Sequence, residues 1–439
     1  MLKVKNLTLA ITLATGLLST NVLLAKDVQP SVNTPNQTLT QQTAPQLLTG
    51  QWDSFNREQL NQLIASYGKT SANYDAKNPP YAVFDWDNTS IFLDIEEATL
   101  IYQIENLAFK MSPETLDKVI RTNIPKDNFS ASSNNMVGKP VNIDLIAQDI
   151  IQNYRWIYEN YSQMKGKLSL EEVKKTNQYK EFSVKLRYLY QAIGDSFDHS
   201  VSYPWVTYLF TGMQESEVAR LARETVKWQA NQPVELVTWT SPAIESKAGQ
   251  VTMKWNNGLR LVPEMKDLYN KLREAGIDVW ICSASFIDVI KELSSNPEFG
   301  YNNPKDHVIA MELERDANGV ILPEYRKGFN QTQGPGKTLE INRLIAPHYQ
   351  NKGPILVAGD SEGDQNMFQD FKDTKRVLII NRLRKPTTDI GKFSKEAVAT
   401  YKKDNAKFLL QGRDENTGSF LPNQKTIPLG KKEAKALRE

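Results

Sequence analysis

Two aspartates separated by one residue, Asp85 and Asp87, have the types and the spacing to do chemistry together. They follow the apolar run 81–84, in the stretch DWDNT. A carboxylate at such a strand-to-loop turn could attack phosphorus and form an aspartyl phosphate. The second carboxylate could protonate the leaving oxygen and later deprotonate a water molecule. The alternative interpretation is an ordinary turn whose Asp and Thr only cap a helix.

Three further motifs carry polar groups of the same kind. Ser283 follows an apolar run, and its hydroxyl could bond a phosphoryl oxygen. Lys337, in GPGKT, lies at a predicted helix start, where the dipole disfavours a cation, so it suggests a role in neutralising a phosphate. Asp360 and Asp364, in GDSEGD, follow another run, and clustered acids of this kind suit Mg²⁺. An ordinary turn serine, an exposed lysine and a Gly-Asp turn are the alternatives.

A parallel sheet would bring these motifs together. Apolar runs of strand length are predicted at 81–84, 277–282, 307–313, 354–359 and 376–380, with amphipathic helical patterns between the later ones. Continuous apolar strands that alternate with helices predict an α/β fold whose parallel sheet is covered on both faces. Active sites of such sheets lie at the carboxyl ends of the strands, which is where Asp85, Ser283 and Asp360 stand.

A long insertion separates the first strand from the others. Between about 95 and 257 the chain is predicted to be mainly helical, with apolar faces in 145–154 and 213–228 and a capping box at Ser169–Glu172. We therefore expect a separate helical lobe over the sheet.

Composition excludes several classes of protein. The chain has 439 residues, 40% hydrophobic and 24% charged, which predicts a globular protein of two or three domains or one domain with a large insertion. A net charge of +2 gives no general attraction to nucleic acid or to an anionic membrane. The single cysteine, Cys282, cannot form an intrachain disulfide, and with three histidines a Cys/His zinc site is not expected. The basic run Lys431–Arg438 is predicted to be a solvated helix.

The amino-terminal segment has the pattern of a targeting signal. Residues 1–25 contain two lysines, a mostly apolar stretch and Ala25, as in a secretory signal peptide. Residues 26–52, almost uncharged and rich in Gln, Thr, Asn and Pro, are predicted to be a flexible linker. We therefore expect an exported chain, periplasmic or secreted, without a stable membrane anchor.

In their order D-x-D-x-T, Ser, Lys and G-D-x-x-x-D, the four motifs resemble the haloacid dehalogenase-like hydrolase superfamily. The resemblance implies a Rossmann-like core, 53–94 and 258–439, with a cap domain, 95–257, inserted after the first motif. It implies that Asp85 is the nucleophile and Asp87 the general acid and base.

The resemblance also implies the remaining parts of the site. Ser283 and Lys337 would bind the phosphoryl group. Mg²⁺ would be held by the carboxylates of Asp85 and Asp360 and by the backbone carbonyl of Asp87. Two supporting residues would be Asp364, which orders metal-bound water, and Thr89, which supports the loop. The acid Asp87 favours a phosphatase over a dehalogenase, because a halide leaves without a proton whereas an alkoxide needs one.

The stretches YAVFDWDNTS, DIEE, SYPWV and PILVAGD look like those of exported phosphorylcholine phosphatases. A quaternary ammonium is recognised by aromatic faces and carboxylates. The candidate substrate-binding residues are Glu96, Glu97, Asp195, Asp198 and Trp205. Before the Tyr-Pro-Trp stretch the chain carries only the two spaced acids Asp195 and Asp198, where the family pattern has a run of adjacent ones. Packing between cap and core is the alternative role of the aromatic side chains.

These observations predict a Mg²⁺-dependent exported phosphomonoesterase that acts through an aspartyl phosphate. Its partner would be a small phosphorylated substrate with a cationic headgroup, phosphorylcholine being the best single candidate, and no nucleic acid. The alternatives are a phosphoserine phosphatase, a broad-specificity acid phosphatase, and a non-enzymatic module that binds a ligand in its cap.

Overall fold

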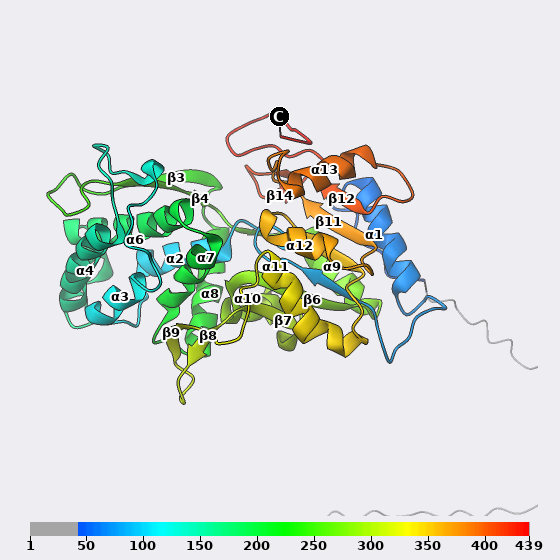
Figure 1. Cartoon of the computed structure of the whole chain (residues 1–439), viewed down its shortest axis with the longest axis horizontal. Helices are drawn as coiled ribbons and strands as arrows, with labels where there is room; N and C mark the ends of the chain where they lie inside the picture. Colours follow the sequence, from blue (N-terminus) through cyan, green and yellow to red (C-terminus); the bar gives the residue numbers. More distant parts are fainter. Residues whose placement is uncertain (1–42, 439) are drawn as a thin grey trace, which may run out of the picture. The chain divides into compact units, whose positions relative to one another are not determined.

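A parallel β-sheet forms the centre of this computed structural model, which describes residues 43–438, all within one compact unit. The strand order is β12-β11-β10-β1-β6-β7, and every neighbouring pair is parallel. The strands are β1 (Tyr81–Phe84), β6 (Asp278–Phe286), β7 (Val308–Met311), β10 (Leu356–Gly359), β11 (Arg376–Ile380) and β12 (Phe408–Gln411) (Figure 1). The predicted α/β fold with a parallel sheet is therefore confirmed, and β12 is an additional strand.

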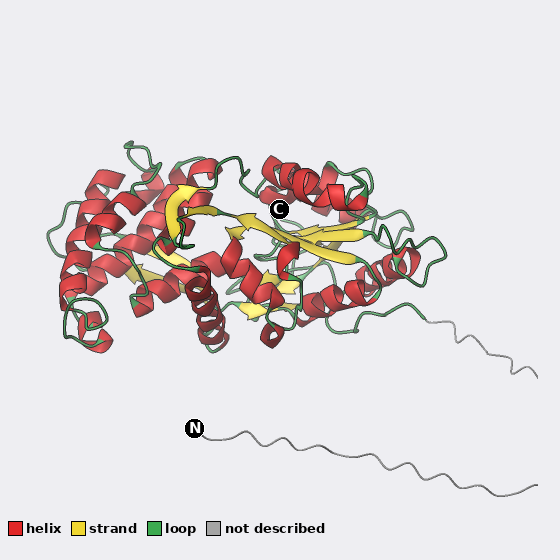
Figure 2. Ribbon diagram, turned by 90° about the horizontal axis from the view of Figure 1, so that it is seen from below, coloured by secondary structure: helices red, strands yellow, loops and turns green. Residues whose placement is uncertain are grey.

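Helices cover both faces of this sheet (Figure 2). On one side Ala82 and Phe84 belong to a core with residues of α1 (Ser54–Tyr67), α9 (Pro263–Glu274) and α10 (Ile287–Ser295). On the other side Tyr81 and Val83 belong to a second core with residues of the helical turn Ile341–Ile345 that follows α11 (Pro335–Glu340), of α12 (Gln365–Gln369) and of α13 (Asp389–Ala399). Successive β1 residues alternate between the two cores, which is why the strand is an unbroken apolar run.

The inserted segment is mainly helical and ends in a β-hairpin. Its helices are α2 (Ile95–Asn106), α3 (Pro113–Ile120), α4 (Ile143–Asn160), α5 (Leu170–Lys174), α6 (Asn177–Ser196), α7 (His199–Thr207) and α8 (Glu215–Ala230). The hairpin pairs β3 (Glu235–Thr240) with β4 (Thr252–Asn257). The chain enters the cap through β2 (Ile91–Phe92) and leaves through β5 (Arg260–Leu261), which pair antiparallel. The exact domain boundaries stay predictions.

A second hairpin ties the core to the cap. The predicted strand 307–313 is divided between β7 and β8 (Leu313–Arg315), and β8 pairs antiparallel with β9 (Ile321–Tyr325). The backbone N–H of Gly212 donates to the carbonyl of Ile321, and the N–H of Ile321 donates to the carbonyl of Met213, both at 2.9 Å. The cap is thus bonded to the core at a point far along the chain from its two connecting strands.

Inside the cap, a buried ion cluster joins α4, α6 and the loop before β4. Lys185 is 0% exposed, and its Nζ donates to Asp149 Oδ2 at 2.8 Å and to Ser246 Oγ at 2.9 Å. Its second carboxylate partner is Glu181 on the same helix. Asp149 also accepts the backbone N–H groups of Lys247 and Ala248, each at 2.8 Å. Three segments of the cap therefore depend on one buried lysine.

Residues 43–52, the carboxyl-terminal part of the predicted flexible linker, are packed against the rest of the protein, so the prediction is wrong for them. Leu47 and Trp52 are buried, the N–H of Leu47 donates to Asn61 Oδ1 at 2.9 Å, and Trp52 contacts Phe420 edge-to-face at 5.2 Å. Because these apolar side chains find partners on α1 and near the carboxyl terminus, residues 43–52 belong to the compact unit. The predicted signal peptide and the rest of the linker lie outside the described residues. Among the described helices, none is long and apolar enough to cross a membrane.

Candidate active site

Several side chains and backbone groups fix the loop that follows β1. The hydroxyl of Ser90 donates to the backbone carbonyl of Asp85 at 2.6 Å. Trp86 is fully buried against Tyr301, with ring centroids 4.8 Å apart. Asn88 has a φ of 58°, a left-handed conformation that asparagine tolerates better than most residues. The carboxylate of Asp85 is therefore presented from a rigid turn at the carboxyl end of the sheet.

Lys337 joins two of the predicted acidic residues. Its Nζ donates to Asp85 Oδ1 at 2.6 Å and to Asp364 Oδ1 at 2.7 Å, and the side chain is almost completely buried. Burial alone would lower the pKa of Lys337, but Asp364 and Asp85 outweigh it and raise that pKa above its usual value. Gly334 begins the turn before α11 with a φ of +51°, and its N–H donates to the carbonyl of Gly363 at 2.7 Å.

Asp364 lies unusually close to the backbone of β10. Its Oδ2 accepts the N–H groups of Asp360 and Ser361 at 2.9 and 3.1 Å. A Cβ at position 359 would lie 2.5 Å from the Asp364 carboxyl carbon, so only glycine fits there. The glycine of the G-D-x-x-x-D motif is explained by this contact.

The carboxylates of Asp85, Asp360 and Asp364 form a buried cluster that could hold a metal ion, with one oxygen of each within 4.8 Å of the others. The hydroxyl of Thr89 lies 3.1 Å from both Asp85 Oδ2 and Asp360 Oδ1, and its single proton can satisfy only one of them. Burial, and then the charge of Asp364, raise the pKa of Asp85 to about 8. A bound cation would reverse that shift, so these hard oxygen donors fit a divalent ion such as Mg²⁺. Both oxygens of Asp364 accept N–H donors, whereas Thr89 can donate to only one of Asp85 Oδ2 and Asp360 Oδ1, so one of those two oxygens keeps no donor and is the better placed to bind it.

Two arginines that the sequence analysis missed hold Asp360. Arg382 Nη1 and Arg384 Nη2 donate to Asp360 Oδ2 at 2.8 and 3.0 Å. Burial would raise the pKa of Asp360, but the two guanidinium groups outweigh it and lower that pKa below its usual value. Both arginines closely follow β11, so the rule about carboxyl ends of parallel strands could have identified them.

Asp87 accepts hydrogen bonds from two donors and does not belong to the cluster of Asp85, Asp360 and Asp364. Its Oδ1 accepts the N–H of Ile95 at 2.7 Å, and its Oδ2 accepts the hydroxyl of Ser285 at 2.6 Å. Burial, and then the charge of Asp94, raise the pKa of Asp87 well above its usual value. This shift favours the protonated form of the carboxyl group, which is the form that a general acid needs.

Ser283 is near these residues along the chain, but its side chain is fully buried. Its Oγ accepts the N–H of Ser285 at 3.1 Å. The pairing of β6 with β7 shifts register between Cys282 and Phe286, and this bulge turns Ser285 toward Asp87. Ser285, although 3% exposed, lines the active-site cavity and Ser283 does not, so Ser285 is better placed than Ser283 for the phosphoryl contact expected of Ser283.

The cap closes a small cavity over these groups. Its volume is about 130 Å³, and Tyr190, Tyr203, Val206, Asp94 and Glu96 line it from the cap and its entry loop. Glu96 Oε1 accepts the N–H of Phe286 at 2.8 Å, whereas the buried Oε2 has no hydrogen-bond partner among residues 43–438. Burial and the charge of Asp94 raise the pKa of Glu96 to about 8. Glu96, one of the residues that line the cavity, therefore has a buried carboxyl oxygen without a donor among the described residues.

Four of the five predicted substrate-binding residues lie elsewhere, and only Glu96 lines the cavity. Asp198 is the N-cap of α7, and Asp195 is exposed on α6. Trp205 is buried in the cap, and its indole N–H donates to the carbonyl of Ile120 at 3.0 Å. Glu97 pairs with Arg187. Asp195, Asp198 and Trp205 do not line this cavity, because helix geometry turns their side chains toward solvent or the cap interior.

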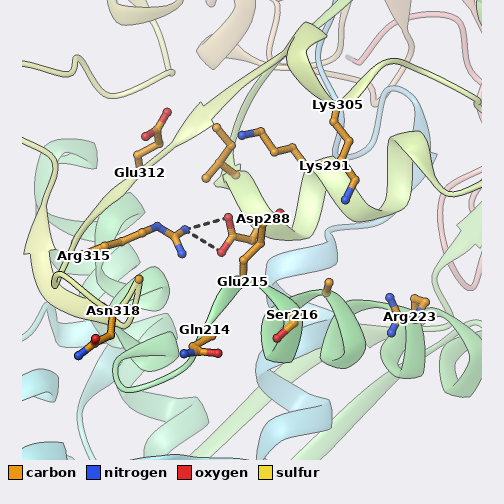
Figure 3. Close-up of a pocket in the computed structure, with 13 residues that line it drawn as sticks. Gln214, Glu215, Ser216, Arg223, Asp288, Lys291, Lys305, Glu312, Arg315 and Asn318 are labelled. Carbon is orange, nitrogen blue, oxygen red and sulfur yellow. Dashed lines mark hydrogen bonds and ion pairs between the residues drawn. The ribbon is translucent and has the colours of Figure 1, made fainter.

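A larger hollow, of about 670 Å³, lies between α8, α10 and the β8–β9 hairpin (Figure 3). Arg315 points across it and makes a two-pronged ion pair with Asp288, and Arg223 pairs with Glu292 at its margin. None of the residues in the carboxylate cluster lines it. The pair Arg223–Glu292 connects the cap to the core, and the pair Arg315–Asp288 joins two elements of the core, so we interpret these contacts as structural.

Comparison with known proteins adds three similarities. Residues 192–369 match a family model described as haloacid dehalogenase-like hydrolase. A phosphorylcholine phosphatase from Pseudomonas aeruginosa is 23% identical over 375 residues, which cover 80% of this chain and 86% of that protein. A solved structure of a functionally unknown protein from Anaerococcus prevotii is 36% identical, with a TM-score of 0.82, and the match covers 87% of this chain and 98% of that one.

Proposed function

Because this chain belongs to the haloacid dehalogenase-like hydrolase family and is a phosphatase, we propose that it hydrolyses small phosphomonoesters through an aspartyl phosphate on Asp85. A carboxylate oxygen of Asp85 attacks phosphorus, the bond from phosphorus to the ester oxygen breaks, and Asp87 gives its proton to that oxygen. Asp87 then takes a proton from water, whose oxygen attacks phosphorus. Inorganic phosphate leaves and Asp85 is regenerated. The raised pKa of Asp87 supports its role as the acid.

The proposal includes Mg²⁺ as the cofactor. The carboxylates of Asp85 and Asp360 and the backbone carbonyl of Asp87 would hold it, with Thr89 supporting the loop and Asp364 a neighbouring water. When bound, it supplies the positive charge that lets an anionic nucleophile approach an anionic phosphate. Lys337 adds a second charge, since its Nζ already bonds the nucleophile at 2.6 Å.

The free oxygen of Glu96 supports a substrate with a cationic headgroup. Its Oε2 is buried, faces no donor among the described residues, and belongs to a side chain that lines the cavity. A quaternary ammonium would neutralise that carboxylate without needing to donate a hydrogen bond. Phosphorylcholine is the substrate of this class that we propose, in agreement with the name of the P. aeruginosa relative.

Phosphate release tests the function directly. The panel would contain phosphorylcholine, phosphoethanolamine, phosphoserine and p-nitrophenyl phosphate, with Mg²⁺, and Asp85→Asn as the control. We expect the highest kcat/KM for phosphorylcholine and a loss of at least about a thousandfold in the variant, because the covalent route is removed. Equal rates on all four esters would favour a broad-specificity phosphatase. A preference for phosphoserine would favour a phosphoserine phosphatase. Wild-type rates in Asp85→Asn would contradict the proposed nucleophile.

Export is a further part of the proposal and is supported by the residue pattern of 1–25. The full chain, expressed in a Gram-negative host, should be recovered from the periplasm or the medium with a new amino terminus near residue 26. A cytoplasmic product that retains Met1 would contradict it.

A further inference from the structure

The charge balance of the active-site cavity does not by itself attract a phosphate ester. The ionisable side chains that line it are six carboxyl groups, Asp85, Asp87, Asp94, Glu96, Asp360 and Asp364, and three cations, Lys337, Arg382 and Arg384. A divalent ion offsets part of this excess of acid. A phosphomonoester dianion still approaches a cavity whose carboxyl groups outnumber its cationic side chains.

A second, larger cavity with the opposite charge adjoins the first. Its volume is about 830 Å³, and Arg382 lines both cavities. Its other charged residues are Lys431, Lys432, Lys435 and Arg438, with Glu415 and Glu433 as the acids. Glu415 already pairs with Arg413 at 2.9 Å. Cations are therefore in clear excess, five against two acids.

The carboxyl-terminal segment that supplies these cations is fixed in place. The helix predicted for Lys431–Arg438 is wrong, because the segment is extended and bonded to the loop after β11. The side-chain amide of Asn381 donates to the carbonyl of Ala436 at 2.8 Å. Thr426 and Lys435 exchange backbone hydrogen bonds of 2.8 and 2.9 Å. The next residue after Asn381 is Arg382, so the segment is anchored directly beside the active site.

We propose that Arg382, Lys431, Lys432 and Arg438 form a basic vestibule, an accessory anion site that collects phosphomonoester dianions and inorganic phosphate beside the catalytic cavity. The inference rests on the proposed function and extends it to how the substrate arrives. Lys431, Lys432 and Arg438 are exposed, and Arg382 reaches from them to Asp360. Fixed charges of one sign raise the local concentration of an oppositely charged ligand and its association rate. The phosphate end of a zwitterionic substrate would meet the vestibule, while its cationic end suits Glu96.

The test removes two vestibule charges that touch no catalytic residue. In Lys431→Gln/Lys432→Gln, we expect kcat/KM for p-nitrophenyl phosphate at low ionic strength to fall about three- to tenfold with kcat nearly unchanged. The difference should shrink as salt is added, because screening acts over about 10 Å at 0.1 M. The matched control is Lys402→Gln/Lys403→Gln, which removes the same charge from an exposed turn before the amino end of β12, whereas Arg382 follows the carboxyl end of the parallel strand β11. The control should behave as the wild type.

Binding of inorganic phosphate separates this inference from the proposed function. Calorimetric titration of the Mg²⁺-loaded protein should give weaker, less salt-dependent binding in the vestibule variant than in the control variant. Equal phosphate affinity and equal kcat/KM in the two variants would overturn the proposed anion site. A vestibule variant in which only kcat falls, or a wild-type protein that does not bind phosphate, would overturn it as well. Absence of turnover on the whole substrate panel would overturn the proposed function. In that case, the comparison of phosphate affinity between the two variants would by itself test whether the vestibule binds anions.

Discussion

Asp87 and Glu96 are both buried carboxyl groups with raised pKa values, yet their surroundings assign them different tasks. Both oxygens of Asp87 accept hydrogen bonds, from Ile95 and Ser285. Glu96 uses one oxygen for the N–H of Phe286 and keeps the other without a donor among the described residues. The first arrangement holds a proton in a fixed direction. The second leaves room for a cation.

Substitution of the acid should affect poor leaving groups most. In Asp87→Asn, turnover of alkyl phosphates should fall by about 10²–10⁴-fold, because the alkoxide leaves without a proton. Turnover of p-nitrophenyl phosphate should fall much less, since p-nitrophenolate is a stable anion. Steady-state rates on a series of esters with graded leaving-group pKa would measure this. Equal losses on all esters would remove Asp87 from the role of acid.

The headgroup contact should depend on pH. Burial and Asp94 raise the pKa of Glu96 to about 8, so its carboxyl group is neutral below that pH and charged above it. Tyr190 from α6 and the N–H of Phe286 also face it. The KM for phosphorylcholine should therefore fall as pH rises from about 7 to about 9, whereas the KM for p-nitrophenyl phosphate should not follow.

The matched variant for this pH effect is Glu96→Gln, which keeps the shape and the acceptor for Phe286. It should raise the KM for phosphorylcholine at high pH and remove the pH dependence. A variant whose KM still fell with rising pH would show that another group titrates.

Among the elements, α6 links the interior of the cap to the active site, since it carries both Lys185 and Tyr190. Lys185→Met should lower the free energy of unfolding by about 3–5 kcal/mol, because it leaves Asp149 and Glu181 buried without their cation. Denaturant unfolding would measure this. Lys180→Met, at an exposed position of the same helix, should change it by less than about 0.5 kcal/mol. Equal losses in the two variants would contradict the importance of the cluster.

Local pattern predicted the strands that carry the motifs. The strand β1 is an unbroken apolar run. In the loop that follows it, Asp85 and Thr89 are only four residues apart, so their contact could be expected from the sequence. The strand β12 was missed because its apolar run, Phe408–Leu410, is short and forms a strand by pairing with β11. The division of 307–313 was missed for the same reason, since β8 depends on its partner β9.

The residues that sequence reasoning missed come from segments distant along the chain. Arg384 reaches Asp360 across 24 residues, and the aromatic residues that line the cavity depend on how α6 and α7 rotate over the core. The family resemblance predicted that residues of the cap recognise the headgroup. The rotation of each helix about its axis then determines that Tyr190 lines the cavity, whereas Trp205 bonds inside the cap. The rotation of a helix about its axis is set by its packing against the rest of the protein, and the spacing of residues in the sequence does not reveal it.

For the molecule as a whole, the metal should contribute to folding as well as to catalysis. The proposed Mg²⁺ site is an acidic cluster that exists only in the folded chain, so Mg²⁺ at about 100 times its Kd should add about 2.7 kcal/mol of stability. The melting temperature should rise by on the order of 5 °C and return after EDTA. Asp360→Asn should lose most of that rise. A melting temperature indifferent to Mg²⁺ would contradict a metal site at this cluster.

The single cysteine gives the protein a simple redox behaviour. Cys282 lies within β6 with no exposed surface, and burial raises the pKa of its thiol to about 12. At ordinary pH it is neither a nucleophile nor a target for oxidants. The chain should therefore reach the same fold in an oxidising and in a reducing compartment. A cysteine introduced at an exposed position, such as Lys402, would be the one thiol open to labels, so fluorophores or spin probes could report on cap and core without removal of a native residue.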